Sequence, residues 1–140
     1  MNRLLLISCL VFLFASCSKE VDEHQLVIRY GISYEMNSQI PFTGTATSYH
    51  ENGQLKNQGT YKNGKLEGLF ETFYENGQLS FKTTYKNGNL NGVYRDYHKS
   101  GQLHYQGIYK NGEKNGSFEY YRENGELLDK TIFLDGAIVD

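Results

Sequence analysis

The chain has 140 residues, which suits one domain and is too short for two of ordinary size. Its formal net charge is −2, and its acids and bases are interspersed. Because the sequence has no row of basic residues that could bind a phosphate backbone, nucleic acid is not an expected partner. The 12 Tyr, 8 Phe and 15 Gly, against a single Pro, favour strands joined by tight turns over helices.

Residues 1–16 have the pattern of a cleaved signal peptide. A positively charged start precedes the almost unbroken apolar stretch 4–14, which is too short for a membrane-spanning helix. The end of this stretch, Phe14-Ala15-Ser16-Cys17, resembles the lipobox of bacterial lipoproteins, in which the Cys is acylated and becomes the new N-terminus. A lipobox ending at Cys9 would leave only a few apolar residues before it, so we predict lipid attachment at Cys17. The alternatives are a buried core helix and a disulfide between the two cysteines.

The residues after Cys17 are polar. We expect residues 17–26 to be a lipid-anchored tether and residues 27–43 to be an N-terminal capping strand region. Ser18, directly after the Cys, resembles the sorting pattern of outer-membrane lipoproteins in Gram-negative bacteria. The sequence therefore predicts an outer-membrane lipoprotein of the bacterial cell envelope, held to the membrane by the lipid on Cys17.

Residues 44–140 form a sequence repeat of period 24, marked by Gly44, Gly68, Gly92 and Gly116. Each unit contains two turn dipeptides of the Asn-Gly type, and the spacing between successive dipeptides alternates between a shorter and a longer stretch. Asn-Gly tolerates positive φ at both positions, as a type I′ hairpin turn requires. The predicted fold is all-β: an elongated single antiparallel meander of β-hairpin repeats with roughly eight to ten strands.

The turns also predict which side chains share a face of the sheet. A two-residue loop at Asn76-Gly77 places Tyr74 opposite Leu79, and alternation assigns the other residues. One face then collects most of the Tyr, Phe and Leu side chains, and the other collects Lys, Glu and Gln. Five mid-strand glycines on the apolar face predict bends or room for aromatic rings. They are Gly59, Gly68, Gly92, Gly107 and Gly116.

The repeat pattern reads Gly68-x-Phe70-x-x-Phe73-Tyr74-x-Asn76-Gly77-x-Leu79 and closes with Tyr85-x-Asn87-Gly88-x-x-x-Gly92. Over residues 41–140 this pattern resembles the bacterial variant of the MORN repeat. Proteins of this kind are often labelled antitoxin components of toxin–antitoxin systems, of the YwqK type. The resemblance implies a scaffold for protein interaction or lipid contact, without a shared set of catalytic residues.

An aromatic stripe is the candidate binding surface. It lies on the otherwise polar face and recurs once per repeat, every ~9–10 Å. Its members are Tyr49, Phe73, Tyr97 and Tyr121. Two interpretations remain open: a ladder that binds a peptide or a glycan, or cross-strand packing that stiffens the sheet by ~0.2–1 kcal/mol per pair.

No metal site, catalytic residue or cofactor is expected. His50 and His98 occupy equivalent positions two repeats apart, about 19 Å, too far to share an ion. His98 and His104 are predicted to point to opposite faces. The carboxylates occur at equivalent positions of successive repeats. Catalytic carboxylates would instead face each other across a cleft and would occur in one repeat only.

The sequence thus predicts a non-enzymatic envelope lipoprotein whose repeats form an interaction scaffold for a protein partner. The alternatives are a structural or glycan-binding envelope protein and an antitoxin-like neutraliser of a toxin. A cytosolic toxin partner conflicts with the export signal and with Cys17 as a lipid anchor.

Overall fold

The computed structural model describes residues 19–139, so Cys17 and the predicted signal peptide lie outside the described residues. Within this range, no helix is long and apolar enough to cross a membrane.

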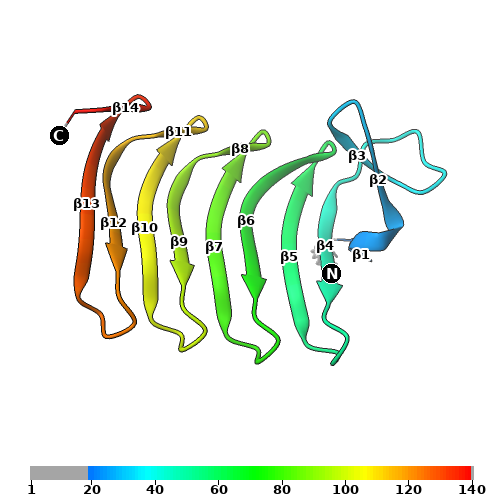
Figure 1. Cartoon of the computed structure of the whole chain (residues 1–140). Helices are drawn as coiled ribbons and strands as arrows, with labels where there is room; N and C mark the ends of the chain where they lie inside the picture. Colours follow the sequence, from blue (N-terminus) through cyan, green and yellow to red (C-terminus); the bar gives the residue numbers. More distant parts are fainter. Residues whose placement is uncertain (1–18, 140) are drawn as a thin grey trace, which may run out of the picture.

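The described residues form one long sheet of twelve strands and a separate two-stranded hairpin, arranged as a single layer (Figure 1). In spatial order the main path is β1 (Glu20–Asp22), β4 (Gly44–Tyr49), β5 (Leu55–Lys62), β6 (Lys65–Phe73), β7 (Leu79–Lys86), β9 (Gly92–Tyr97), β10 (Leu103–Lys110), β12 (Gly116–Tyr121), β13 (Leu127–Leu134) and β14 (Ala137–Ile138). Two short strands pair beside it, β8 (Asn89–Leu90) on β7 and β11 (Glu113–Lys114) on β10. Consecutive strands from β4 onward pair antiparallel, which confirms the predicted all-β meander of hairpin repeats.

The N-terminal edge of the sheet is covered. β1 lies in the segment predicted to be a tether, and it pairs in parallel with β4. The hairpin of β2 (Leu26–Arg29) and β3 (Ile32–Glu35) follows the short 3-10 helix η1 (Glu23–Gln25). Its Ser33 donates a backbone hydrogen bond to Gly64 and accepts one from Phe42, both 2.8 Å. Val21, Phe42 and Ala46 form a small buried core at this end.

The two turns of each repeat differ in geometry. The upper turns, at the top of Figure 1, have positive φ at both central residues, for example 51° at Asn87 and 83° at Gly88. This confirms type I′ turns at Asn63-Gly64, Asn87-Gly88, Asn111-Gly112 and Asp135-Gly136. In the lower turns only the glycine has positive φ. There, Gly77 donates to the carbonyl of Tyr74, and Tyr74 donates to Gln78, both at 2.8 Å. The lower turns are therefore three-residue loops ending in a left-handed glycine.

The longer lower turn corrects the predicted register. Phe73, and not Tyr74, lies opposite Leu79, and the next pair is Thr72 with Phe81. The extra residue, Ser80, forms a β-bulge, and its hydroxyl lies 2.7 Å from that of Thr72. Because paired residues project to the same side, the leucine predicted for the aromatic face lies on the other face, with Phe73. The same register shift places Leu55, Leu103 and Leu127 on the polar face as well.

The aromatic face packs its rings against one another, since no second layer covers it within residues 19–139. The rings form a chain of contacts with centroid separations of 4.3 to 6.1 Å from Phe70 to Phe133. Phe118 is 1% exposed, and the Lys114 ammonium lies 4.9 Å from the centre of its ring. Stacking along the sheet therefore buries side chains that a single layer would otherwise leave in water.

The predicted roles of the mid-strand glycines are both confirmed, at different positions. Gly68, Gly92 and Gly116 have φ of 95°, 132° and 90° and mark the bends in the strands. The bends separate β8 from β9 and β11 from β12, which partly explains why the sheet has more strands than expected. Gly59 and Gly107 instead make room for aromatic rings. A Cβ atom at Gly107 would lie 2.2 Å from Phe118.

Neighbouring repeats are also joined through their turns. The glycine of each upper turn donates its N–H to a carbonyl just after the preceding upper turn, as from Gly88 to Leu66 and from Gly112 to Leu90, both at 2.8 Å. Gly64 and Gly136 make the equivalent bonds to Phe42 and Lys114. Each repeat thus supplies hydrogen-bond partners for the next, as expected for a repeat protein whose units contact only their neighbours.

We expect Gly107→Ala to destabilise the sheet by about 1–3 kcal/mol, because the added methyl group overlaps the buried ring of Phe118. Urea unfolding followed by circular dichroism measures the change. The control is the same substitution combined with Phe118→Leu, where the smaller side chain leaves space. An equal cost of Gly107→Ala in both backgrounds would rule out the steric explanation.

Candidate interaction surface

The four predicted stripe residues lie in one row on the polar face, at the lower ends of the strands. The register pairs them with Leu55, Leu79, Leu103 and Leu127, respectively. Sequence analysis placed these leucines on the other face, so the row is twice as rich in apolar side chains as predicted. We call these eight residues the apolar row: Tyr49, Leu55, Phe73, Leu79, Tyr97, Leu103, Tyr121 and Leu127.

The apolar row is accessible to solvent along its length. Tyr49 and Leu127, at its two ends, are 52% and 51% exposed. The six residues between them are half-buried. Within the described part of the chain, no pair of row residues is in aromatic contact, whereas the aromatic face forms a continuous set of ring contacts. Ring–ring packing therefore accounts for the aromatic face and leaves the aromatic residues of the row unexplained.

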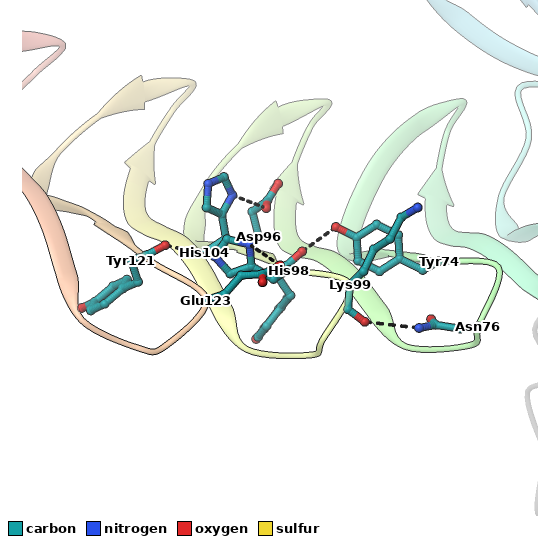
Figure 2. Close-up of polar contacts among 9 residues, drawn as sticks. Tyr74, Asn76, Asp96, His98, Lys99, His104, Tyr121 and Glu123 are labelled. Atoms are coloured by element: carbon teal, nitrogen blue, oxygen red, sulfur yellow. Dashed lines mark hydrogen bonds and ion pairs between the residues drawn. The ribbon is translucent and has the colours of Figure 1, made fainter.

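Hydrogen bonds between repeats fix the backbone of the row. The ring Nε2–H of His50 donates to the Phe73 carbonyl at 2.8 Å, and its equivalent His98 donates to the Tyr121 carbonyl at 3.0 Å. In the repeat between them, the Tyr74 hydroxyl donates to the Tyr97 carbonyl at 2.6 Å. Figure 2 shows Tyr74 and His98 reaching from one lower turn to the next. The side chains of the row therefore project from a backbone that is held at regular intervals.

The lower turns carry a second set of contacts of the same kind. The side-chain amide of Asn52 donates to the Glu75 carbonyl at 2.7 Å, and that of Asn76 donates to the Lys99 carbonyl at 3.2 Å (Figure 2). The side-chain oxygen of Asn76 also accepts from the backbone of Gln78 at 3.0 Å. The turn residue thus closes its own loop and links it to the next one.

Tyr121 is the row residue with the most specific side-chain contacts. Its hydroxyl donates to Glu119 at 2.6 Å, and Gln106 and Ser117 also donate to this carboxylate, at 2.9 and 3.0 Å. These hydrogen bonds, led by the one from Tyr121, lower the pKa of Glu119 to about 2. The carboxylate is therefore ionised at neutral pH and orients the Tyr121 ring.

A row of charged and amide side chains runs beside the apolar row on the polar face. We call it the charged row. Its members lie opposite one another on successive strands from β5 to β13: Gln58, Glu71, Lys82, Arg95, Gln106, Glu119 and Lys130. Glu71 accepts from Gln58 at 3.0 Å and from Lys82 at 2.8 Å. The apolar row thus has a polar border with fixed charges.

The histidine prediction was wrong in one respect. The ring centres of His98 and His104 are 4.5 Å apart, so the two side chains do not point to opposite faces. His104 is the bulged residue of its hairpin, and its Nδ1 lies 3.0 Å from Asp96 (Figure 2). The equivalent pair one repeat earlier is Thr72 with Ser80. An alignment of the repeats places His104 at the position of Ser80, so the sequence alone shows that the two residues are equivalent.

Among residues 19–139 there is no group of three or more His, Cys, Asp or Glu residues that could hold a metal ion. Burial raises the pKa of the nearby Tyr94 and Tyr105 hydroxyls above the usual value for tyrosine. These hydroxyls remain protonated at neutral pH and are poor nucleophiles.

Comparison with known families identifies the repeat. A profile of the MORN repeat variant matches three consecutive segments, in register with the period of the sequence. Residues 42–63, 66–87 and 90–111 each match the MORN repeat variant. Each matched segment begins before a strand bend and ends at the Asn of an upper turn. Residues 114–135 continue the geometry of the MORN repeats, with β12, a lower turn and β13.

Comparison with whole proteins adds little. No curated protein sequence matches the chain. Among solved structures, the crystal structure of the GtfA/B complex bound to UDP and GlcNAc is similar over 74% of this chain, with 9% identity and a TM-score of 0.32. The match spans 22% of the length of that chain. A likeness this low does not indicate a shared activity or a shared fold.

The hydrogen bond from Tyr121 to Glu119 predicts a pH-dependent effect of Tyr121→Phe. A carboxyl group whose pKa is lowered by folding stabilises the fold above its unfolded pKa, and this contribution is lost as the pH falls towards about 2. We expect Tyr121→Phe to destabilise the protein by about 1 kcal/mol at pH 7, after discounting for solvent exposure, and to raise the pKa of Glu119.

The difference from the wild type should shrink as the pH falls from above 4.5 towards 2, as measured by urea unfolding and by NMR titration of the carboxyl carbon. Tyr97→Phe is the matched control. Tyr97 occupies the equivalent position one repeat earlier. The residue two positions before it is Arg95, whereas the residue two positions before Tyr121 is Glu119. A pH-independent effect of Tyr121→Phe would contradict the assignment.

Proposed function

We propose that this protein is a non-enzymatic scaffold of the bacterial cell envelope that binds a protein partner through the apolar row. The observation that carries the proposal is the row itself. It places four aromatic and four leucine side chains on the face that is not needed for aromatic packing. Accessible aromatic side chains on a rigid backbone are typical of interaction surfaces, because they contribute contact area at low entropic cost.

The repeat class supports a binding role. MORN repeats are commonly protein-binding or membrane-binding repeats. The two rows on the polar face offer apolar area bordered by fixed charges, which suits recognition of another surface more than turnover of a small substrate. We therefore assign no catalytic residue and no cofactor.

The membrane side of the proposal rests on the leader sequence alone. We propose that residues 1–16 are removed, that Cys17 carries the lipid, and that the repeats stand on the outer membrane. An envelope location separates the scaffold from cytosolic toxins, so we propose an envelope partner in preference to an antitoxin role. β1 begins at Glu20, close in sequence to the proposed lipid, which would hold the sheet near the membrane surface.

Replacing Cys17 tests the anchor. We expect the full-length protein expressed in a Gram-negative host to incorporate labelled palmitate and to fractionate with the outer membrane. Cys17→Ala should lose both properties, because the thiol proposed to be acylated is gone, whereas Cys9→Ala should keep both. Palmitate incorporation by the Cys17→Ala variant would contradict the assignment.

Partner capture tests the scaffold. We expect the full-length protein to retain a defined envelope protein from solubilised membranes, and Phe73→Ser/Tyr97→Ser to reduce this retention at least tenfold, since central aromatic residues dominate binding energy. The control is Ile28→Ala/Ile40→Ala, which removes exposed apolar side chains outside the row. Equal retention by all three proteins would contradict a role for the apolar row.

A glycan is the second candidate ligand, because accessible aromatic rings at regular intervals also suit stacking against the sugars of a chain. Retention on isolated envelope polysaccharide, lost with the same Phe73→Ser/Tyr97→Ser variant, would favour a glycan over a protein partner.

A further inference from the structure

At one position of the charged row, neighbouring repeats carry side chains of opposite charge. Equivalent positions in three successive repeats hold Glu71, Arg95 and Glu119, so the middle repeat has the opposite charge. Each glutamate lies between a glutamine and a lysine. Glu119 accepts from Gln106 at 2.9 Å and lies 3.7 Å from the Lys130 ammonium. The row therefore has two paired carboxylates with a guanidinium between them.

Arg95 has no protein partner of opposite charge within residues 19–139. The register places it opposite Lys82 on one side and Gln106 on the other. Lys82 is bound to Glu71, and Gln106 is bound to Glu119. Two cations directly opposite each other destabilise a sheet unless an anion lies nearby. The five donors of the Arg95 guanidinium are therefore left for an acceptor from another molecule.

The surface is hollowed on both sides of Arg95. One hollow of about 280 Å³ is lined by Leu69, Lys82, Val93 and Arg95, with the adjacent threonines. The other, of about 290 Å³, is lined by Val93, Arg95 and Ile108, with Glu119 and its partners Gln106 and Ser117 on the far side from Lys82. Leu69, Val93 and Ile108 are 38%, 44% and 49% exposed. Each hollow thus offers apolar side chains next to an accessible guanidinium.

We propose that Lys82, Arg95 and the two hollows bind an acidic segment of the partner protein, with one carboxylate on Arg95 and apolar neighbours in the hollows. A guanidinium pairs with a carboxylate through two parallel hydrogen bonds, and the incoming group supplies the charge that glutamate has in the flanking repeats. A flat anionic membrane would also meet the carboxylates of Glu71 and Glu119 in the same row, which disfavours it as the occupant. This inference names the partner's chemistry and therefore rests on the scaffold function proposed above.

The test uses the full-length chain in mild detergent and a fluorescein-labelled peptide of alternating Leu and Glu residues, read by fluorescence polarisation. We expect this peptide to bind at least tenfold more tightly than its Leu-Gln counterpart and to weaken with added salt. Arg95→Glu should reduce the affinity at least tenfold. It should not lower the melting temperature, because it restores the carboxylate of the repeat between Lys82 and Gln106.

Lys62→Glu is the matched control, since it makes the same change in net charge at an exposed upper-turn residue opposite Lys65. It should leave the affinity within twofold of the wild type. Equal affinity for the two peptides, an equal loss in both variants, or unchanged binding by Arg95→Glu would overturn the inference. Binding to phosphatidylglycerol vesicles that depends on Arg95, without binding to the peptide, would also overturn it.

The partner-capture experiment separates the two proposals. If Arg95→Glu still retains the captured envelope protein that Phe73→Ser/Tyr97→Ser loses, the scaffold function stands and the acidic-segment inference fails. If neither variant changes retention of that protein, both the apolar row and Arg95 are excluded as its binding surface.

Discussion

The hydrogen bonds that close the lower turns, from the Tyr74 N–H to the Gln78 carbonyl and at the three equivalent turns, determine which side chain lies on which face. They enlarge each lower loop to three residues, and the β-bulge that follows absorbs the extra residue. Beyond the bulge the strands return to the alternation that the upper type I′ turns require. The even repeat length can then keep aromatic rings on one side and charges on the other through every hairpin.

A single layer with one aromatic face must bury that face without a second sheet. The structure does this along its length, because each ring packs against rings of the neighbouring strands and Gly107 leaves space for Phe118. The hydrogen bonds between upper turns and between lower turns add contacts from repeat to repeat. Stability is therefore distributed over neighbouring units, and the polar face contributes to it mainly through its charged row.

The side chains of the polar face are less constrained by packing, so this face can carry residues that bind another molecule. Its apolar row is supported from behind by carbonyl contacts from His50, Tyr74 and His98, which fix the backbone without covering the side chains. Its charged row has a cation at Arg95, where the repeats on either side have Glu71 and Glu119. A departure from a repeat that costs the sheet a favourable pairing is most simply understood as a feature selected for contact with another molecule.

The sequence by itself determined the fold class, the period, the number of turns and the separation of aromatic from charged residues, because hydrophobic alternation and Asn-Gly turns are local properties. The stripe of Tyr49, Phe73, Tyr97 and Tyr121 could also be found from the sequence. The leucines beside it could not, since two-residue and three-residue loops fit the same Asn-Gly dipeptide and differ by one residue in register. Hydrogen bonding across the sheet decided between them, and it thereby placed Leu79 beside Phe73 and brought His98 into contact with His104.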